Sequence, residues 1–262
     1  MLLKGEPRLR LEGCVAVITG GAGGMGRDTA LLFAQEGARV VVGDVDEAGG
    51  ATVADAARDM PGEIAFQRCD VAREADVAAL IAAAEDRHGR LDTIFNNAGI
   101  EQPVTPTQDV TEALFRGVID TNLVGTFFGM KHALPALERA GGGTIVNNSS
   151  VSAFANVGGN ISYAASKGAV MSMTRVVAIE YARRKIRCNA INPGVIDTGM
   201  NQRNKALADD PEAVERRWSE ITPMGRMGTG NEIAEAVLFL ASPASSFITG
   251  VGLLVDGGRV AT

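Results

Sequence analysis

Residues 14–26 read CVAVITGGAGGMG. The first five residues are apolar, as in a strand buried on both faces, and glycines dominate the turn that follows. From Arg27 to Glu36 the pattern is typical of a helix. Such a strand, turn and helix can cradle a dinucleotide pyrophosphate, because glycine lets the backbone approach the phosphates and a helix N-terminus favours negative charge. This stretch therefore predicts the first unit of a doubly wound α/β sheet.

The rest of the chain continues the alternation of short β-branched runs and longer helical ones. We expect strands at Val15–Thr19, Arg39–Gly43, Ile64–Arg68, Thr93–Asn96, Thr144–Asn148, Arg187–Ile191 and Gly252–Val255. We expect helices near Met25–Glu36, Glu47–Asp59, Glu74–His88, Thr111–Arg139, Tyr163–Arg184 and Asn231–Leu240. No linker or repeat divides the sequence, so residues 1–262 are predicted to form one Rossmann-type domain, a sheet of seven mainly parallel strands with helices on both faces.

Composition and charge exclude several classes of function. Of the 262 residues, 46% are hydrophobic and 32 are glycine, which suits an α/β core of small aliphatic side chains. The net charge of -6 argues against a nucleic-acid-binding surface. One basic cluster, at residues 183–187, follows a helical run and is interpreted as a solvated helix end.

The sequence also argues against metal, disulfide and membrane roles. The three cysteines are far apart and lie in or beside apolar runs, so they are interpreted as reduced and buried. The two histidines have no further ligands at metal-binding spacing. The segment Met1–Pro7 carries charges and does not resemble a signal peptide, and no apolar run is long enough to span a membrane. We therefore expect a cytoplasmic protein.

The glycine-rich turn and the next strand predict how a cofactor is held. Gly20 permits the tight turn, Gly24 lets the backbone approach the phosphates, and Gly26 allows close packing of the helix. Asp44 ends the next strand, where a carboxylate can accept hydrogen bonds from both ribose hydroxyls and would repel a 2′-phosphate. Asp44 could instead cap the following helix, although Asp46 is better placed to do so. With no cation among the sequence neighbours of Asp44, NAD is favoured over NADP.

A second group of residues carries the chemistry. Tyr163 and Lys167 are four residues apart and share one face of a helix. A phenol beside an ammonium is a suitable proton donor and acceptor for interconverting an alcohol and a ketone. Ser150, at the end of the fifth strand, adds a hydroxyl, although each of these residues taken alone could be structural.

Together these motifs resemble the short-chain dehydrogenases/reductases in their compact, single-domain branch. The matching pieces run in the family order from about Leu11 to Gly258. They are Thr19-Gly20-x-x-x-Gly24-x-Gly26, Asp70-Val71, Asn96-Asn97-Ala98-Gly99, Asn122, Ser149-Ser150, Tyr163-x-x-x-Lys167 and Pro193-Gly194. The sequence shows no departure from the family pattern at the catalytic positions.

The resemblance implies a role for each catalytic residue. Tyr163 would be the general acid/base, with its pKa lowered by the Lys167 ammonium and by the positive nicotinamide. Lys167 would also hold the nicotinamide ribose. Ser150 would bond the same substrate oxygen as Tyr163, and Asn122 would anchor a water that connects Lys167 to solvent.

The resemblance also implies the cofactor site. Pro193, Gly194, Ile196 and Thr198 would lie against the nicotinamide, with the Ile196 backbone and the Thr198 hydroxyl on its carboxamide. The remaining cofactor-binding residues are predicted to be Gly20, Gly23, Gly24, Met25, Gly26, Asp44, Val45, Asp70, Val71, Asn97, Ala98, Gly99, Tyr163 and Lys167. Asp70 and Asn97 could also be plain turn residues, because Asp and Asn favour turns.

The substrate side is predicted less sharply. Ser150, Ser152, Val157, Tyr163 and Trp218 are assigned to it, together with polar Glu101, Gln102 and Asn156. Residues 198–230 interrupt the alternation of strands and helices and are interpreted as a lid or as an ordinary surface helix. Within them, Asp210-Pro211-Glu212 predicts a helix start, with Trp218 facing inward. A cyclic or polyhydroxylated alcohol fits this mixture of apolar and polar residues.

Three functions remain open at this stage. The first is an NAD-dependent dehydrogenase or reductase of a secondary alcohol or ketone. The second is a 3-oxoacyl carrier-protein reductase using NADPH, with Arg139 and the 183–187 cluster receiving an acidic carrier. The third is a non-catalytic NAD-binding module, against which the complete catalytic set argues. The resemblance further implies a homotetramer that packs through the segments near Thr111–Arg139 and Tyr163–Arg184.

Overall fold

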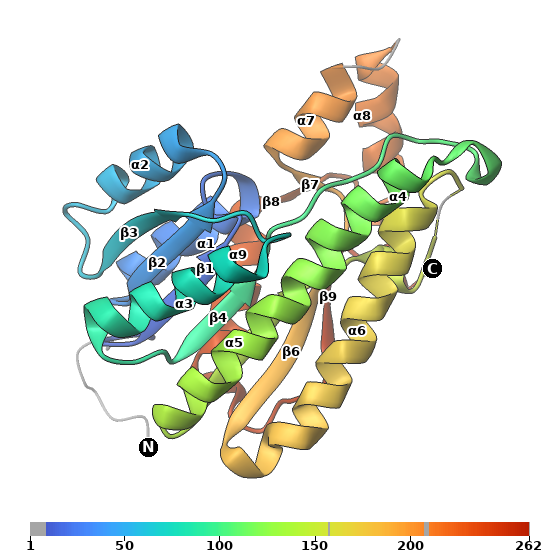
Figure 1. The fold of residues 1–262 in the computed structure, drawn as a ribbon. Helices are drawn as coiled ribbons and strands as arrows, with labels where there is room; N and C mark the ends of the chain where they lie inside the picture. The colour runs from blue at the N-terminus through green and yellow to red at the C-terminus, as the bar shows by residue number, and fades with distance from the viewer. Residues whose placement is uncertain (1–8, 157, 207–209, 262) are drawn as a thin grey trace, which may run out of the picture.

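The computed structural model describes residues 9–156, 158–206 and 210–261, and Figure 1 shows their arrangement. The strands are β1 (Val15–Thr19), β2 (Arg39–Asp44), β3 (Glu63–Arg68), β4 (Thr93–Asn96), β5 (Gly143–Asn148), β6 (Ile186–Pro193), β7 (Ile196–Asp197), β8 (Gly228–Thr229) and β9 (Gly252–Val255). The helices are α1 (Gly24–Gln35), α2 (Glu47–Ala56), α3 (Glu74–His88), α4 (Glu112–Ile119), α5 (Gly125–Arg139), α6 (Ile161–Tyr181), α7 (Gly199–Ala206), α8 (Pro211–Glu220) and α9 (Gly230–Ala241).

Seven parallel strands form the main sheet in the order β3-β2-β1-β4-β5-β6-β9. The predicted doubly wound α/β sheet is therefore confirmed. The chain first builds outward from β1 to β3 and then returns to place β4 on the other side of β1. At such a reversal the connections leave in opposite directions, which opens a crevice at the carboxyl ends of β1 and β4.

Helices cover both faces of the sheet because the central strands are apolar on both sides. Ile18 lies in a core with Phe33 of α1 and Val237 of α9. The preceding residue, Val17, lies in the opposite core with Leu80 of α3. In Figure 1, α3, α5 and α6 lie in front of the sheet, and α1 and α9 lie behind it. All five residues of β1 are buried, as expected for a central parallel strand.

One predicted helix is interrupted. Thr111–Arg139 was expected to be continuous, but α4 and α5 are joined by a π-helical turn at Asp120–Val124. The turn contains Asn122, whose side chain is fully buried and bonds the backbone of Ile100 on both sides. A π-turn widens the helix locally and commonly marks a functional position.

The segment 198–230 is more structured than the sequence indicated. The predicted helix start is confirmed, because Asp210 caps α8 by accepting from the Ala213 amide. A second helix, α7, precedes it, and a short parallel ladder between β7 and β8 joins the two ends of the segment. Trp218 was predicted to face inward, but it is only partly buried. The α8 helix has no buried residue, Trp218 is half-buried, and Ile221 is 37% exposed.

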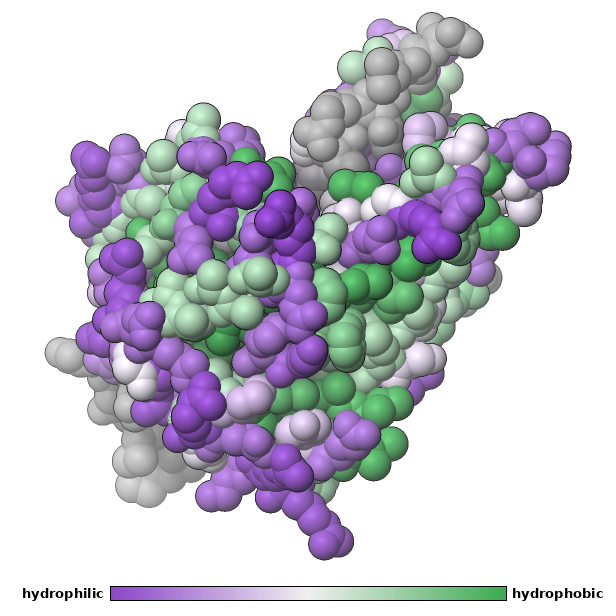
Figure 2. All heavy atoms as spheres, in the orientation of Figure 1, coloured by the Kyte–Doolittle hydropathy of each residue, from purple (hydrophilic) through white to green (hydrophobic). Residues whose placement is uncertain are grey.

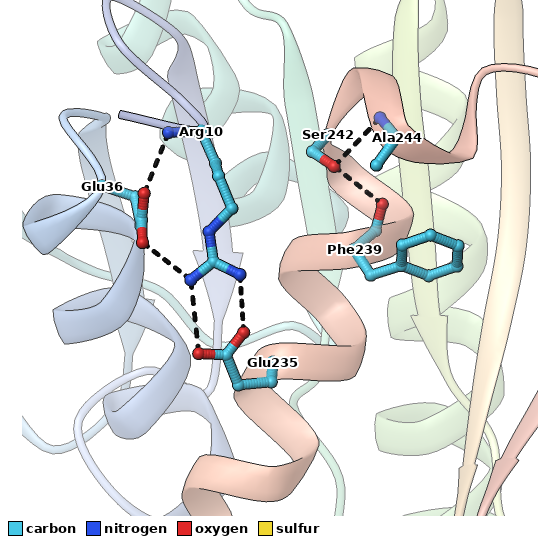
Figure 3. Close-up of polar contacts among 6 residues, drawn as sticks. All are labelled: Arg10, Glu36, Glu235, Phe239, Ser242 and Ala244. Atoms are coloured by element: carbon cyan, nitrogen blue, oxygen red, sulfur yellow. Dashed lines mark hydrogen bonds and ion pairs between the residues drawn. The ribbon is translucent and has the colours of Figure 1, made fainter. Parts of the chain in front are cut away.

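An ion-pair clamp fixes the start of the described chain to two helices (Figure 3). The Arg10 guanidinium binds Glu36, at the end of α1, and Glu235 of α9, with N–O distances of 2.7 Å to each. Its backbone amide also donates to Glu36. The hydrogen bonds that the Arg10 guanidinium donates to Glu235, and secondly to Glu36, raise the pKa of Arg10. Since α1 packs against α9, this cation separates two carboxylates that would otherwise repel each other.

Cys14, Cys69 and Cys188 are free, and the last two are buried. Among residues 9–156, 158–206 and 210–261, no cluster of side chains suits a metal ion. None of the helices in that part of the chain is long and apolar enough to cross a membrane.

Gly129 provides a test of how tightly α5 packs on the sheet. A Cβ at Gly129 would lie 1.9 Å from Oδ1 of the buried Asn96, whereas a Cβ at Gly117 in α4 would meet nothing within 4 Å. We expect Gly129→Ala to lower the free energy of unfolding by about 1–3 kcal/mol. Gly117→Ala should raise it by about 0.5–1 kcal/mol, because alanine is the better helix former. Urea denaturation of both variants checks this, and equal effects would contradict the packing.

Candidate active site

The glycine-rich turn between β1 and α1 lies against the end of β4. Gly20 and Gly24 have left-handed φ angles of +66° and +52°, which favour glycine. A Cβ on Gly20 would be 2.7 Å from the Cα of Ala98, and one on Gly26 would be 2.1 Å from the carbonyl oxygen of Gly20. The turn therefore has no room for side chains at Gly20 or Gly26.

Asn97 holds this turn in place. Its Nδ2 donates to the carbonyl oxygens of Thr19 and Gly20, each at 3.0 Å. In the other direction, Oγ1 of Thr19 accepts from the amides of Asn97 and Ala98 at 3.0 and 3.1 Å. Asn97 and Ala98 are thus more than local turn residues, because they fix the turn from the neighbouring strand.

The N-terminus of α1 is open to an anion. Its N-cap residue is Gly23, no side chain caps it, and its first turn holds no acidic residue. By contrast, α2 and α8 are each capped by an Asp and carry a Glu in the first turn. A Cβ on Gly23 would meet nothing within 4 Å, so open space faces these amides. Free amides, the positive helix end and this space fit a pyrophosphate.

Asp44 ends β2 directly beside the glycine-rich turn. Its Oδ2 accepts from the Ala22 amide at 3.0 Å and its Oδ1 from the Asp46 amide at 3.1 Å. Asp46, not Asp44, caps α2 by accepting from the Gly49 amide. The capping alternative for Asp44 is therefore wrong. The next residue, Val45, is 58% exposed, so a side chain is available to cover a bound group.

The structure brings a cation, Arg68, close to Asp44, although no cation is near Asp44 in the sequence. Arg68 of β3 is the register partner of Asp44. Its side chain lies 3.7 Å from a Glu47 oxygen and 3.6 Å from an Asp76 oxygen. The negative charges of Glu47 and Asp76 therefore already attract the Arg68 guanidinium. This makes Arg68 a poorer ligand for a phosphate.

The Asp70-Val71 pair has a visible structural role. The Asp70 carboxylate accepts from the Ala72 amide at 3.0 Å, and the Asp70 amide donates to Asp76 at 3.1 Å. Val71 is buried, and a Cβ on Gly125 would lie 2.9 Å from its side chain. Both residues hold the loop after β3 against the start of α3 and α5, at the carboxyl edge of the sheet.

Lys167 is a buried amine beside the predicted catalytic phenol. Only 3% of Lys167 is exposed, and desolvation lowers its pKa to about 8. Its Nζ donates to the carbonyl oxygen of Asn148 at 2.7 Å and lies 5.5 Å from the centre of the Tyr163 ring. One turn of α6 thus brings the two side chains together, as their spacing predicts.

Tyr163 and Ser150 are brought together from different elements. Tyr163 lies in the first turn of α6, and Ser150 follows β5. Burial raises the pKa of Tyr163 to about 12, and a hydrogen bond with Ser150 opposes that rise. Ser150 is itself held by the Ser152 amide, which donates to its Oγ at 3.1 Å. Ser152, which was predicted to contact substrate, therefore bonds the Ser150 hydroxyl through its own backbone amide.

Asn122 lies near Lys167, on the other side of Gly99. Its Oδ1 accepts from the Ile100 amide at 2.8 Å, and its Nδ2 donates to the Ile100 carbonyl oxygen at 2.9 Å and to Ser166 Oγ at 3.3 Å. Gly99 lies between Asn122 and Lys167, since a Cβ there would be 3.2 Å from Asn122 Oδ1 and 3.5 Å from Lys167 Nζ.

The loop after β6 reaches the glycine-rich turn. Pro193 ends β6, and a Cβ on Gly194 would be 2.8 Å from the Cα of Asp256. Ile196 is buried in β7, and a Cβ on Gly24 would lie 3.7 Å from Thr198. The predicted nicotinamide residues thus adjoin the predicted pyrophosphate residues in space. Of the other predicted substrate residues, Trp218 lies in α8, and Val157 is outside the described residues.

Sequence reasoning assigned no role to Gln102 beyond a possible contact with substrate. Gln102 is 3% exposed, donates to the Gly159 carbonyl oxygen at 3.0 Å and accepts from the Ser162 amide at 2.8 Å. It therefore ties the loop after β4 to the start of α6. The Asn148 carbonyl oxygen that holds Lys167 could not be predicted, because a backbone oxygen leaves no mark in the sequence.

Known proteins with this arrangement are numerous. A family model described as enoyl-(acyl carrier protein) reductase matches residues 20–259. L-fucose dehydrogenase of Oryctolagus cuniculus is 42% identical over 95% of this chain and 86% of that protein. Cis-4-hydroxycyclohexanecarboxylate dehydrogenase of Sinomonas cyclohexanicum is 42% identical over 94% of this chain and 96% of that protein.

Among solved structures, levodione reductase superposes with a TM-score of 0.91 at 37% identity, over 97% of this chain and all of that one. The likeness thus covers the main sheet together with α6, the helix that carries Tyr163 and Lys167. The chain belongs to the short-chain dehydrogenase/reductase family of oxidoreductases.

Proposed function

We propose that this chain oxidises a secondary alcohol, or reduces the corresponding ketone, with NAD as its cofactor. The observation that carries the proposal is the placement of one phenol between a bonding hydroxyl and a buried amine. Tyr163 bonds Ser150, and Lys167 lies 5.5 Å from its ring. This arrangement provides a proton carrier and two groups that hold it, beside a turn that fits a pyrophosphate.

Tyr163 exchanges a proton with the substrate oxygen. Its pKa of about 12 is too high for a base near neutral pH, so the phenolate needs stabilisation during the reaction. The Lys167 ammonium supplies a positive charge close to the ring. Ser150 donates to the same substrate oxygen and fixes its position. NAD, when bound, takes up or returns the hydride.

Lys167 passes the proton onward to a water, and Asn122 helps to position that water. With a pKa of about 8, Lys167 is protonated at neutral pH yet close to titration. Asn122 is locked to Ile100 on one side, and Gly99 keeps side-chain atoms out of the space between Asn122 and Lys167. We assign that space to a water that relays the proton between Lys167 and solvent.

NAD is favoured over NADP by the charges around the end of β2. Asp44 accepts hydrogen bonds through both carboxylate oxygens and stays directed at the glycine-rich turn. Arg68 is the cation nearest in register, but Glu47 and Asp76 lie beside it. A 2′-phosphate would therefore meet a largely negative surface.

The carrier-protein alternative is weaker. Arg139 forms a forked pair with Glu85, with N–O distances down to 2.8 Å. Arg184 pairs with Glu138, and Arg187 donates to three backbone carbonyl oxygens. Three of the basic side chains considered as a dock for an acidic carrier are thus already engaged. A non-catalytic module is disfavoured because the complete proton-transfer set is assembled.

The substrate is proposed to enter beneath α7 and α8, which act as a lid. In the chain, α7 and α8 come after the nicotinamide loop and before α9, and both stand over the carboxyl ends of the strands. Ligands of open α/β sheets bind at that edge. We place the reaction in the cytoplasm, which suits the free cysteines.

A homotetramer is proposed from two apolar surfaces on different sides of the molecule. Figure 2 shows hydrophobic side chains gathering over α5 and α6, where Val176 is 53% and Ile179 81% exposed. The other surface lies at α9 and the edge strand β9, with Phe247 fully exposed and Leu254 42% exposed. Two self-complementary surfaces with different axes generate a closed tetramer.

Tyr163→Phe removes the hydroxyl that carries the proton. We expect turnover to fall about 100-fold to 10,000-fold, the usual contribution of a general acid/base. NADH binding should be retained. Tyr181→Phe is the matched control, since Tyr181 ends α6 beneath Arg184, and its turnover should be unchanged. Steady-state rates and NADH fluorescence titration check both, and an active Tyr163→Phe enzyme would disprove the proposed chemistry.

Asp44→Ala removes the proposed ribose acceptor. The value of kcat/KM with NAD should fall about tenfold or more, because a hydrogen bond to a charged group is lost. The value with NADP should rise relative to it, because the repelling charge is gone. Rates with both cofactors measure this. A strong preference of the wild-type enzyme for NADPH would overturn the assignment and favour the carrier-protein alternative.

The tetramer is tested by breaking one surface at a time. The wild-type protein should have the mass of about four chains of 27.2 kDa in light scattering after size-exclusion chromatography. Ile179→Glu and Phe247→Glu should each give dimers, since each leaves one surface intact. A monomeric wild-type protein would contradict the proposal.

A further inference from the structure

We propose that Gln102 is a positioning residue for the proposed reaction: it caps the start of α6 from the loop after β4 and so holds Tyr163 in place. The inference rests on the proposed function, since Tyr163 is the proposed acid/base. It goes beyond that function by adding a buried residue that acts on Tyr163 only through the backbone of the helix.

The start of α6 has no cap of its own. Its N-cap residue is Asn160, whose side chain makes no capping hydrogen bond, and its first turn carries no acidic residue. By contrast, α2, α8 and α9 each begin with a side chain that accepts from a first-turn amide, and each has a glutamate in that turn. The first amides of a helix have no partner within it and need one from outside.

Gln102 supplies this missing partner from a distant segment. Its Oε1 accepts from the amide of Ser162, the second residue of α6, at 2.8 Å. An N-cap side chain ordinarily binds an amide at this position. Gln102 is 3% exposed and Ser162 is fully buried. Loss of the bond would therefore leave a buried amide unpaired, which is unfavourable.

A second bond keeps the Gln102 side chain in this orientation. Its Nε2 donates to the carbonyl oxygen of Gly159 at 3.0 Å, and the Thr105 amide donates to the same oxygen at 2.9 Å. Gly159 has a left-handed φ of +82°, and a Cβ there would lie 2.7 Å from Cγ1 of Val104. The loop after β4 therefore packs directly on the residues that lead into α6.

The loop is also fixed at its beginning. The amide and the carbonyl oxygen of Ile100 both bond the side chain of Asn122, which is fully buried in the π-helical turn. Gln102 follows closely along the chain. A capping group on an anchored backbone holds the helix in one place, whereas one on a free loop would move with the helix.

The effect is confined to the first turn of α6, which carries Tyr163. Tyr163 directly follows Ser162, and its hydroxyl bonds Ser150. Lys167 lies one turn further, where its carbonyl oxygen accepts from Ser149 Oγ at 2.9 Å and its side chain is buried. Because helices fray from their terminal turn, loss of the cap loosens the phenol and leaves the amine in place.

The neutral charge of the cap suits the proposed chemistry. The positive end of a helix favours a negative group in its first turn, and the phenolate form of Tyr163 is such a group. Two charged groups already act there: Lys167 is the nearby cation, and Glu101 raises the pKa of the phenol after the larger effect of burial. A carboxylate at position 102 would add negative charge and oppose the phenolate, whereas glutamine satisfies the amide without it.

Gln102→Met keeps the volume of the side chain and removes both hydrogen bonds. In the full-length protein we expect kcat for the reduction of cyclohexanone by NADH to fall about tenfold to hundredfold, because a small displacement of a catalytic group has such an effect. The Kd of NADH, measured by fluorescence titration, should be unchanged, since Lys167 stays in place. Gln108→Met, exposed in the same connection between β4 and α4, is the matched control and should change neither value.

Hydrogen–deuterium exchange locates the effect independently of activity. In Gln102→Met, a peptide covering residues 158–166 should exchange faster than in the wild-type protein, and a peptide covering residues 167–181 should not. Faster exchange along the whole helix would show a general loss of stability and overturn the positioning role. Unchanged exchange at residues 158–166 would overturn it as well.

Gln102→Glu is the conservative variant. A buried carboxyl beside a carbonyl oxygen stays protonated at about pH 6, and it then accepts from Ser162 and donates to Gly159 as the glutamine does. Its kcat relative to the wild type should be restored at about pH 6 and should fall towards about pH 8, as the carboxyl ionises and loses its donor. A ratio that does not change with pH overturns the inference, also where Gln102→Met fails to fold.

The outcomes separate this inference from the function on which it rests. A folded Gln102→Met enzyme with the kcat of the wild type overturns the inference and leaves the dehydrogenase intact. A weaker binding of NADH with an unchanged kcat also overturns it, because the residue would then act on the cofactor site. Failure of the wild-type protein to turn over any alcohol or ketone with either cofactor overturns the proposed function, while the exchange experiment still reports whether Gln102 caps α6.

Discussion

The close contact between the glycine-rich turn and the end of β4 is the constraint on which the rest of the site depends. Gly20 and Gly26 leave no space for a Cβ, and Asn97 bonds the turn through both Thr19 and Gly20. This contact places the connection between β1 and α1 against β4, the strand at which the strand order reverses. The open end of α1 then lies beside the carboxyl ends of β4 and β5, where the residues proposed to be catalytic emerge. Without that approach, the proposed anion site and the proposed proton-transfer site would stand apart.

The sequence predicts the strands well, because each is a short apolar run that ends in glycine or polar residues. The main sheet has the expected strands with ends shifted by at most two residues. The proximity of Tyr163 to Lys167 also follows from helical spacing alone. Both features are local, so a single pattern is enough to find them.

Other features depend on contacts between distant segments, and no local pattern reveals them. The π-helical turn forms where Asn122 bonds the backbone of Ile100, 22 residues away. Arg68 becomes a neighbour of Asp44 only through strand register. Trp218 follows an amphipathic spacing, yet α8 has little to pack against and leaves it half-buried. In each case tertiary placement, not propensity, decides the outcome.

The small ladder between β7 and β8 has a consequence for how this enzyme can change. It joins the two ends of the segment that carries α7 and α8, directly after the loop predicted to hold the nicotinamide. An insertion closed at its base can differ in length and sequence without pulling on the strands beneath it. Evolution, or an engineer, could therefore exchange the proposed substrate cover as a module while the Rossmann-type sheet beneath it stays unchanged.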